Sequence, residues 1–182
     1  MALRPWKKLS ERNLAVNNWW TYRRDEYELP GGRKGEYHYV HTEGASLIVP
    51  QLDDGSLVLV RQYRYLCMRE SLEFPCGGVK SGSSYEETAA AELGEEAGYK
   101  AGAMRLIGEF NPYNGITDEI CRVYLASHLT HIGHHREATE EMELVVLSVP
   151  DFARRVHSGE IWDGMTLAAW VLVSPLLSRD EP

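Results

Sequence analysis

The sequence predicts an α+β protein in which helices cover both faces of a mixed sheet. Two observations carry this prediction. Segments with a strand pattern outnumber segments with a helical pattern, and turn residues separate neighbouring strands as they do in hairpins. The chain has 182 residues, which is enough to bury a sizeable core without disulfides.

Six segments have the apolar or alternating pattern of β-strands. They are residues 36–41, 45–51, 57–64, 104–110, 120–126 and 142–149. The turn residues Pro30, Gly31 and Gly32 stand before the first segment. The hairpin signal Asp-Asp-Gly at residues 53–55 separates the second segment from the third. We therefore expect antiparallel hairpins within the sheet.

Three segments are predicted to be helical: residues 84–97, 151–157 and 163–177. The ends of the first are marked on both sides. Ser83 and Ser84 are candidate N-cap residues, because each is followed three residues later by a glutamate. Gly98 is a natural C-terminal stop, because glycine readily adopts the left-handed conformation that ends many helices.

Charge and cysteine content restrict the partners and the compartment. The 27 acidic residues outnumber the 19 basic ones, which leaves a net charge of −8. We therefore expect neither a nucleic-acid polymer nor a membrane surface as a partner, because the chain has no excess of cations. Cys67, Cys76 and Cys121 are an odd number without a C-x-x-C pair, and the most apolar segment, residues 167–177, is too short to span a bilayer. These features predict a soluble, cytoplasmic protein.

An acidic helical face is the main chemical feature. Glu92, Glu95 and Glu96 are spaced i, i+3 and i+4, so a helix places their carboxylates on one face. Like charges at this spacing repel one another, whereas a hard cation that prefers oxygen ligands, such as Mg²⁺, would bring them together. Glycines within residues 77–82 let the backbone approach a ligand closely. The pattern indicates a metal site, with a solvated helix face as the alternative.

Residues 77–99 resemble the Nudix box. The box has the pattern Gly, five residues, Glu, seven residues, Arg-Glu-aliphatic-x-Glu-Glu-x-Gly-aliphatic, and the chain matches it at Gly77 and over residues 92–98. Ser83 and Ala91 stand where the family has Glu and Arg. Because both members of that pair are absent, no unpaired buried charge is left. We expect activity to survive, because the carboxylates of Glu92, Glu95 and Glu96 are intact. We interpret Ser83 as the helix N-cap.

Four other segments resemble the ADP-ribose pyrophosphatase branch of the Nudix family. They are residues 18–32, 61–77, 114–119 and 159–166. The last three are similar to its Gln-x-Arg…Glu-x-Pro-Ala-Gly, Gly-x-Ser/Thr-Asp-Glu and Gly-x-Ile-x-Asp-x-x-Thr motifs. The resemblance implies an α/β/α Nudix sandwich over residues 44–182. It also implies an antiparallel strand extension over residues 1–43 that forms a homodimer and supplies part of the substrate pocket.

The activity that this resemblance implies is hydrolysis of the pyrophosphate in a nucleoside diphosphate sugar, with ADP-ribose giving AMP and ribose 5-phosphate. The cofactor is Mg²⁺, with Mn²⁺ as the other candidate, because an acidic pocket can bind an anionic pyrophosphate only through a divalent cation. By the resemblance, Glu92 and Glu96 are metal ligands. Glu95 is a ligand or a catalytic carboxylate next to the ligands, and Cys76 contributes its carbonyl oxygen.

The general base is expected in the loop of residues 137–143, because the resemblance places it on a mobile loop before the last strands. Glu140 is the first candidate and Glu137 the second, and their spacing does not decide between them. A pKa near the working pH would distinguish the base from the glutamates that are merely solvated loop charges.

Four residues are candidates for binding the substrate: Arg64, Glu73, Glu119 and Trp20. Arg64 suits a phosphate, Glu119 suits sugar hydroxyls, and Glu73 belongs to the same motif as Arg64. Trp20 offers an aromatic face on which a nucleobase can stack. The alternatives are surface or hairpin-pairing roles for Arg64 and Glu119, and packing in a dimer interface for Trp20.

The residues alone leave other functions open. GDP-mannose, or a further nucleoside diphosphate sugar, is the alternative substrate. A non-catalytic Nudix sensor of ADP-ribose is suggested by Ser83 and Ala91, whereas the intact set Glu92, Glu95 and Glu96 favours an enzyme. An mRNA-decapping enzyme is disfavoured, because the sequence has no basic patch.

Overall fold

The computed structural model describes residues 3–133 and 142–177. The chain divides into two compact units. The N-terminal unit comprises Met1–Glu43 together with Asn111–Ile120, and the main unit comprises Gly44–Phe110 and Cys121–Pro182. No helix among the described residues is both long and apolar enough to cross a bilayer.

The main unit contains two sheets. The four-stranded sheet has the order β7-β4-β9-β8, and the three-stranded sheet has the order β10-β5-β6. The strands are β4 (Ala45–Pro50), β5 (Leu57–Arg64), β6 (Arg69–Glu73), β7 (Cys76–Gly78), β8 (Tyr99–Phe110), β9 (Cys121–His131) and β10 (Met142–Leu147). Strand β4 is parallel to β9 and antiparallel to β7, so the four-stranded sheet is mixed, as predicted.

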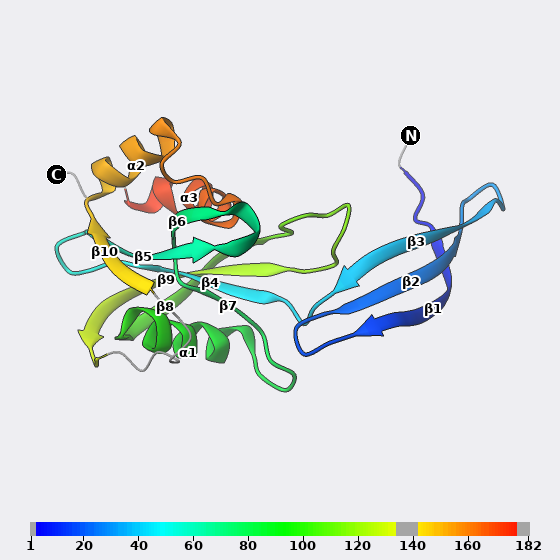
Figure 1. Cartoon of the computed structure of the whole chain (residues 1–182), viewed down its shortest axis with the longest axis horizontal. Helices are drawn as coiled ribbons and strands as arrows, with labels where there is room; N and C mark the ends of the chain where they lie inside the picture. Colours follow the sequence, from blue (N-terminus) through cyan, green and yellow to red (C-terminus); the bar gives the residue numbers. More distant parts are fainter. Residues whose placement is uncertain (1–2, 134–141, 178–182) are drawn as a thin grey trace. The chain divides into compact units, whose positions relative to one another are not determined.

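Helices lie on both sides of these sheets, as Figure 1 shows: α1 on one side, and α2 and α3 on the other. Helix α1 spans Tyr85–Ala97, α2 spans Val149–Ser158 and α3 spans Gly164–Leu177. A short 3₁₀ turn, Tyr65–Cys67, joins β5 to β6. The predicted α+β class, with both faces of a sheet covered, is confirmed.

The buried residues of the main unit form two apolar clusters, and β4 contributes to both. Leu47 and Val49 belong to the cluster that includes Phe152 of α2 and Val173 of α3, whereas Ile48 belongs to the cluster with Leu93 of α1. Successive side chains of a strand point to opposite faces, so a strand covered on both faces has to be apolar throughout. This explains the continuous apolar run from which β4 was predicted.

Helix α1 begins at a capping box. The Ser84 hydroxyl accepts the Glu87 N–H, and the Glu87 carboxylate accepts the Ser84 N–H. The carboxylate accepts hydrogen bonds from both the N–H and the hydroxyl of Ser84, and these two bonds lower the pKa of Glu87 from its ordinary value of 4.5. At the other end, Gly98 is left-handed with φ of 71°, as expected for a C-terminal stop. The N-cap is therefore Ser84, and our interpretation of Ser83 as the cap was wrong by one residue.

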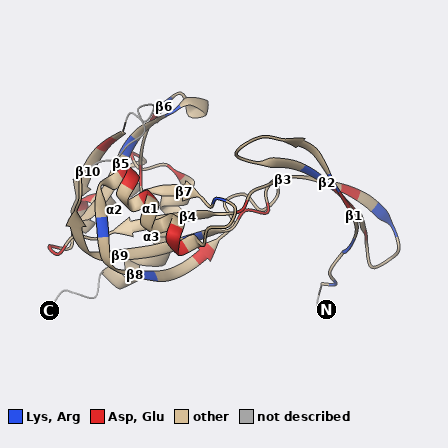
Figure 2. Ribbon diagram, turned by 90° about the horizontal axis from the view of Figure 1, so that it is seen from below, with Lys and Arg blue, Asp and Glu red and all other residues tan. Residues whose placement is uncertain are grey.

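The N-terminal unit is built on a three-stranded antiparallel sheet with the order β1-β2-β3. Its strands are β1 (Lys7–Val16), β2 (Thr21–Glu28) and β3 (Lys34–His41). Figure 2 shows acidic and basic segments close together on β1 and β2. Ion pairs join neighbouring strands there, with Lys8 to Asp25 at 2.8 Å and Arg24 to Glu36 at 3.2 Å. The hydrogen bonds that the Lys8 ammonium donates to Asp25 and Glu11 raise the pKa of Lys8.

Candidate active site

The acidic face of α1 meets strand β7. Glu96 is 7% exposed, and its Oε2 accepts the N–H of Cys76 at 3.0 Å. Glu92 lies against the backbone of Gly77, because a Cβ built at that glycine would stand 2.0 Å from the Oε1 of Glu92. Glu95 is exposed. The structure thus brings Glu92 and Glu96 to the same short strand and leaves Glu95 on the outer side of the face.

The donors on this face suit a hard divalent cation. Across residues 3–133 and 142–177, the side chains form no group of three or more His, Cys, Asp or Glu placed to hold a metal, so a cage made only of protein side chains is not formed. Mg²⁺ is usually held by one or two carboxylates, with waters and substrate phosphates as its other ligands. Glu92 and Glu96 supply two carboxylates. Because Gly77 has no side chain, it leaves room for the carboxylate of Glu92. This donor set fits Mg²⁺ or Mn²⁺.

Residues 74–76, which we call the strap, lead from β6 into the first residue of β7, the strand that contacts the acidic helix. The Phe74 N–H donates to Thr166 Oγ1 at 3.2 Å, and the Pro75 carbonyl accepts the Ile48 N–H at 2.9 Å. The Cys76 N–H is bound by Glu96. Three consecutive residues are therefore held by α3, β4 and α1, which fixes the backbone of Cys76 beside the two carboxylates.

Arg64 and Glu73, two predicted substrate-binding residues, are paired with each other. Glu73 is 2% exposed. Its carboxylate accepts hydrogen bonds from two nitrogens of Arg64, Nη2 and Nε, the second at 2.8 Å. It also accepts one from Gln62 Nε2 at 3.3 Å. The bonds to Glu73 raise the pKa of Arg64, and the charges of Asp163 and Glu96 act in the same direction. Arg64 is thus a fixed cation within electrostatic reach of the acidic face, and Glu73 is the residue that orients it.

Glu119 and Trp20 lie in the N-terminal unit. The Glu119 carboxylate accepts the hydroxyl of Thr42 at 3.0 Å, and the Asn111 side chain donates to the Glu119 carbonyl at 2.7 Å. Trp20 is 42% exposed in the turn between β1 and β2, where its N–H donates to Asn17 Oδ1 at 2.9 Å. Both residues are therefore held by their own surroundings, and the aromatic face of Trp20 is accessible.

The two candidate bases, Glu137 and Glu140, lie outside the described residues. Sequence reasoning missed two residues that support the site, Thr166 and Gln62. Both occur in segments whose resemblance to the ADP-ribose pyrophosphatases we had noted, but only the folded chain shows that they reach Phe74 and Glu73.

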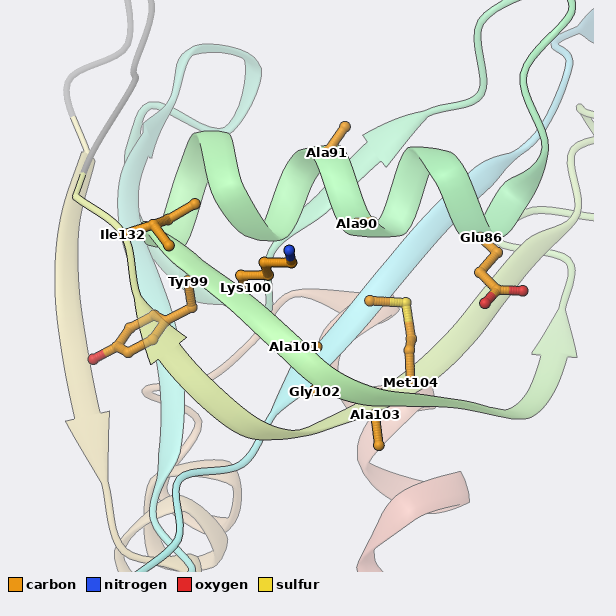
Figure 3. Close-up of a pocket in the computed structure, with 10 residues that line it drawn as sticks. All are labelled: Glu86, Ala90, Ala91, Tyr99, Lys100, Ala101, Gly102, Ala103, Met104 and Ile132. Carbon is orange, nitrogen blue, oxygen red and sulfur yellow. The ribbon is translucent and has the colours of Figure 1, made fainter.

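A cavity of about 570 Å³ opens on another side of α1, between that helix and β8. Figure 3 shows its lining: Glu86, Ala90, Ala91, Tyr99, Lys100, Ala101, Gly102, Ala103, Met104 and Ile132. None of the three acidic-face glutamates is among these residues. Ala91, which replaces the arginine of the Nudix box, contributes to this cavity and not to the strap.

Comparisons with known proteins agree with this fold. The model of the NUDIX domain matches residues 40–164. An ADP-ribose pyrophosphatase of Mycobacterium tuberculosis is 33% identical over 95% of this chain and 85% of its own length. A GDP-mannose pyrophosphatase of Salmonella typhimurium is 30% identical over 87% of this chain and 90% of its own.

The fold is also found in a solved structure, that of an ADP compounds hydrolase. It superposes with a TM-score of 0.84 at 22% identity, and the match covers 98% of this chain and 97% of that one. Together with the family-model match, this likeness confirms the predicted Nudix fold. Because the family model covers more than half of the sequence, the chain belongs to the NUDIX domain family.

Proposed function

We propose that this chain hydrolyses the pyrophosphate bond of nucleoside diphosphate sugars, with ADP-ribose giving AMP and ribose 5-phosphate. The observation that carries the proposal is the meeting of Glu92 and Glu96 at β7, with Arg64 held in electrostatic reach of Glu96. A pyrophosphate needs positive charge around it, and a bound cation and a fixed guanidinium would supply this charge from two directions.

The residues of the main unit divide the work as follows. Glu92 and Glu96 hold the divalent cation, with the Cys76 carbonyl as a further ligand and Glu95 as an outer ligand or a catalytic carboxylate. A bound Mg²⁺ or Mn²⁺ polarises the phosphoryl group and lowers the pKa of a bound water. Arg64 uses only two of its five N–H groups for Glu73, so it keeps donors for a phosphate oxygen.

We assign the removal of a proton from the attacking water to Glu140, with Glu137 as the second candidate. Trp20 stacks on the nucleobase, and Glu119 accepts hydrogen bonds from sugar hydroxyls. The exposed, amphipathic face of Trp20 supports its assignment. The Thr42 hydroxyl on Glu119 supports the other, because it orients the carboxylate.

We also propose that the protein is a cytoplasmic homodimer joined through its N-terminal unit. All ten residues of β1 are exposed, and they include Leu14 and Val16 at 42% and 68% exposure. Trp6 and Trp19 add further exposed apolar surface. A three-stranded sheet needs apolar packing for stability, and a second copy of this chain would supply it. Three free cysteines support a reducing compartment.

The test is release of AMP from ADP-ribose by the purified protein, with Mg²⁺ or Mn²⁺ and with EDTA. Glu96→Gln keeps the size of the side chain and an oxygen that can accept the Cys76 N–H. We expect it to fold normally and to lose at least about 100-fold in kcat, because the cation loses a charged ligand. Turnover in EDTA, or a kcat for Glu96→Gln close to that of the wild type, would contradict the metal site.

GDP-mannose is the second candidate substrate, favoured by the likeness to a GDP-mannose pyrophosphatase. The ratio of kcat/KM for ADP-ribose and GDP-mannose decides between the two sugars. A protein that binds ADP-ribose tightly but releases no AMP would instead be the non-catalytic sensor considered above.

A further inference from the structure

The hydroxyl of Thr166 is buried and contacts the strap from the side of α3, whereas the acidic face of α1 contacts it from the other side. Thr166 lies in the first turn of α3, has no exposed surface and accepts the Phe74 N–H at 3.2 Å. The two residues are 92 positions apart in the sequence. Nothing in the proposed chemistry uses this hydroxyl directly, yet it binds a backbone group only two residues from Cys76.

Hydrogen bonds from three elements act on the strap. Pro75 has no N–H, so the two N–H groups of the strap belong to Phe74 and Cys76. One is bound by Thr166 and the other by Glu96, and Ile48 binds the carbonyl between them. Loss of the Thr166 oxygen would leave a buried N–H without its acceptor and would let the strap shift toward water.

Thr166 is itself held firmly. Its N–H donates to Asp163 Oδ2 at 2.7 Å, and Asp163 O accepts the Leu167 N–H at 3.0 Å. Just before this turn, Trp162 Nε1 donates to the Glu70 carbonyl at 3.0 Å, and the Arg69 guanidinium lies 3.7 Å from the centre of the Trp162 ring. The start of α3 is therefore fastened to β6, so the Thr166 oxygen is a fixed acceptor.

We propose that Thr166 is a positioning residue for the metal site. Its hydroxyl holds the strap at the height at which the Cys76 carbonyl and Glu96 can share one cation. The inference rests on the proposed function, because it requires a cation at Glu92 and Glu96. Groups that orient metal ligands typically change metal affinity by about 10- to 100-fold when they are removed. A purely structural role for Thr166 would instead lower stability and leave the affinity of the folded protein unchanged.

The experiment is calorimetric titration of Mn²⁺ into the full chain without substrate. Thr166→Val keeps the shape of the side chain and removes the acceptor, and we expect it to bind Mn²⁺ at least about tenfold more weakly. Thr166→Ser keeps the hydroxyl and should bind as the wild type does. Thr88→Val is the matched control, because Thr88 is also buried but its hydroxyl donates to Ser84 O within the first turn of α1. It should leave the affinity unchanged.

The outcomes separate the inference from the proposed function. A wild-type site that depends on Glu96, together with unchanged affinity in Thr166→Val, overturns the positioning role alone. Weak binding by Thr166→Ser also overturns it. A wild-type protein that binds no Mn²⁺ overturns the proposed function as well. If Thr166→Val does not fold, Thr166→Cys makes the same distinction, because a thiol is close in size and is only a weak acceptor.

Discussion

At Gly77 the backbone of β7 passes so close to α1 that any side chain would overlap a carboxylate. The nearest atoms to a Cβ there are Oε1, Cδ and Cγ of Glu92, at 2.0, 2.1 and 2.6 Å. The neighbouring Gly78 has no atom within 4 Å of such a Cβ. A side chain would therefore clash with Glu92 at position 77 but would meet no atom at position 78. Only Gly77 is required by the geometry of the acidic face.

Gly77→Ala should therefore weaken metal binding without unfolding the protein. The Glu92 side chain is flexible and will turn away from the new methyl group, which removes one carboxylate from the cation. We expect Mn²⁺ affinity to fall by about tenfold or more, as titration would measure. Gly78→Ala is the control and should bind as the wild type does. Equal affinities in the two variants would show that Glu92 is not a ligand.

At the scale of the element, local sequence signals predicted the ends of α1, whereas its contacts depend on residues elsewhere in the chain. Its limits were predicted to within one residue, because a capping box, a glycine stop and a helical period are all properties of neighbouring residues. The positions of Glu92 and Glu96 on one face followed from the same period. The sequence did not predict that these carboxylates contact β7, because a loop separates β7 from the helix and the path of that loop depends on packing.

Ser84→Ala should reduce the free energy of unfolding by about 1 kcal/mol, a typical effect of losing an N-cap. Urea denaturation at pH 7 would measure it, with Ser83→Ala as a control that is exposed and expected to have no effect. The Glu87 charge contributes only while it is ionised, and its folded pKa is the lower one. The stabilisation by Glu87 is therefore complete at pH values above 4.5, the ordinary pKa, and is lost as the pH falls through the folded pKa. Equal stability of Ser84→Ala and Ser83→Ala would contradict the assigned cap.

Strands β1 and β2 were foreseen only as an extension over residues 1–43 and not as separate elements. Every residue of β1 is exposed and many are charged, so the continuous buried apolar run that marks β4 and the start of β5 is absent. Ion pairs such as Lys8 to Asp25 connect the strands across the sheet, and a single-sequence pattern does not show which charges will meet. The same holds for the bond between Phe74 and Thr166, which spans 92 positions.

At the scale of the whole molecule, the two units depend on different forces. The main unit encloses two apolar clusters, whereas the N-terminal unit shows exposed ion pairs and exposed aromatic side chains. Surface ion pairs contribute little to stability. The carboxylates proposed to hold the metal, Glu92 and Glu96, both belong to the main unit, so a cation bound there should stabilise that unit.

Mn²⁺ should therefore raise the melting temperature of the protein. At a concentration 100 times the dissociation constant, binding adds about 2.7 kcal/mol, which corresponds to roughly 5–10 °C for a domain of this size. Scanning calorimetry with and without Mn²⁺ would measure the shift, and EDTA should reverse it. Glu92→Gln should show a much smaller shift. An equal shift in that variant would mean that the stabilising cation binds elsewhere.

The strap also couples the acidic face to motion elsewhere in the main unit. The amide hydrogens of Ile48, Phe74 and Cys76 are each committed to a neighbour, and together these bonds link β4, α3 and α1 to one short segment. Such hydrogens exchange with deuterium only when the element that holds them moves away. Opening any one of these elements would therefore change exchange at the strap, so the rigidity of the proposed metal site depends on all three layers of the main unit.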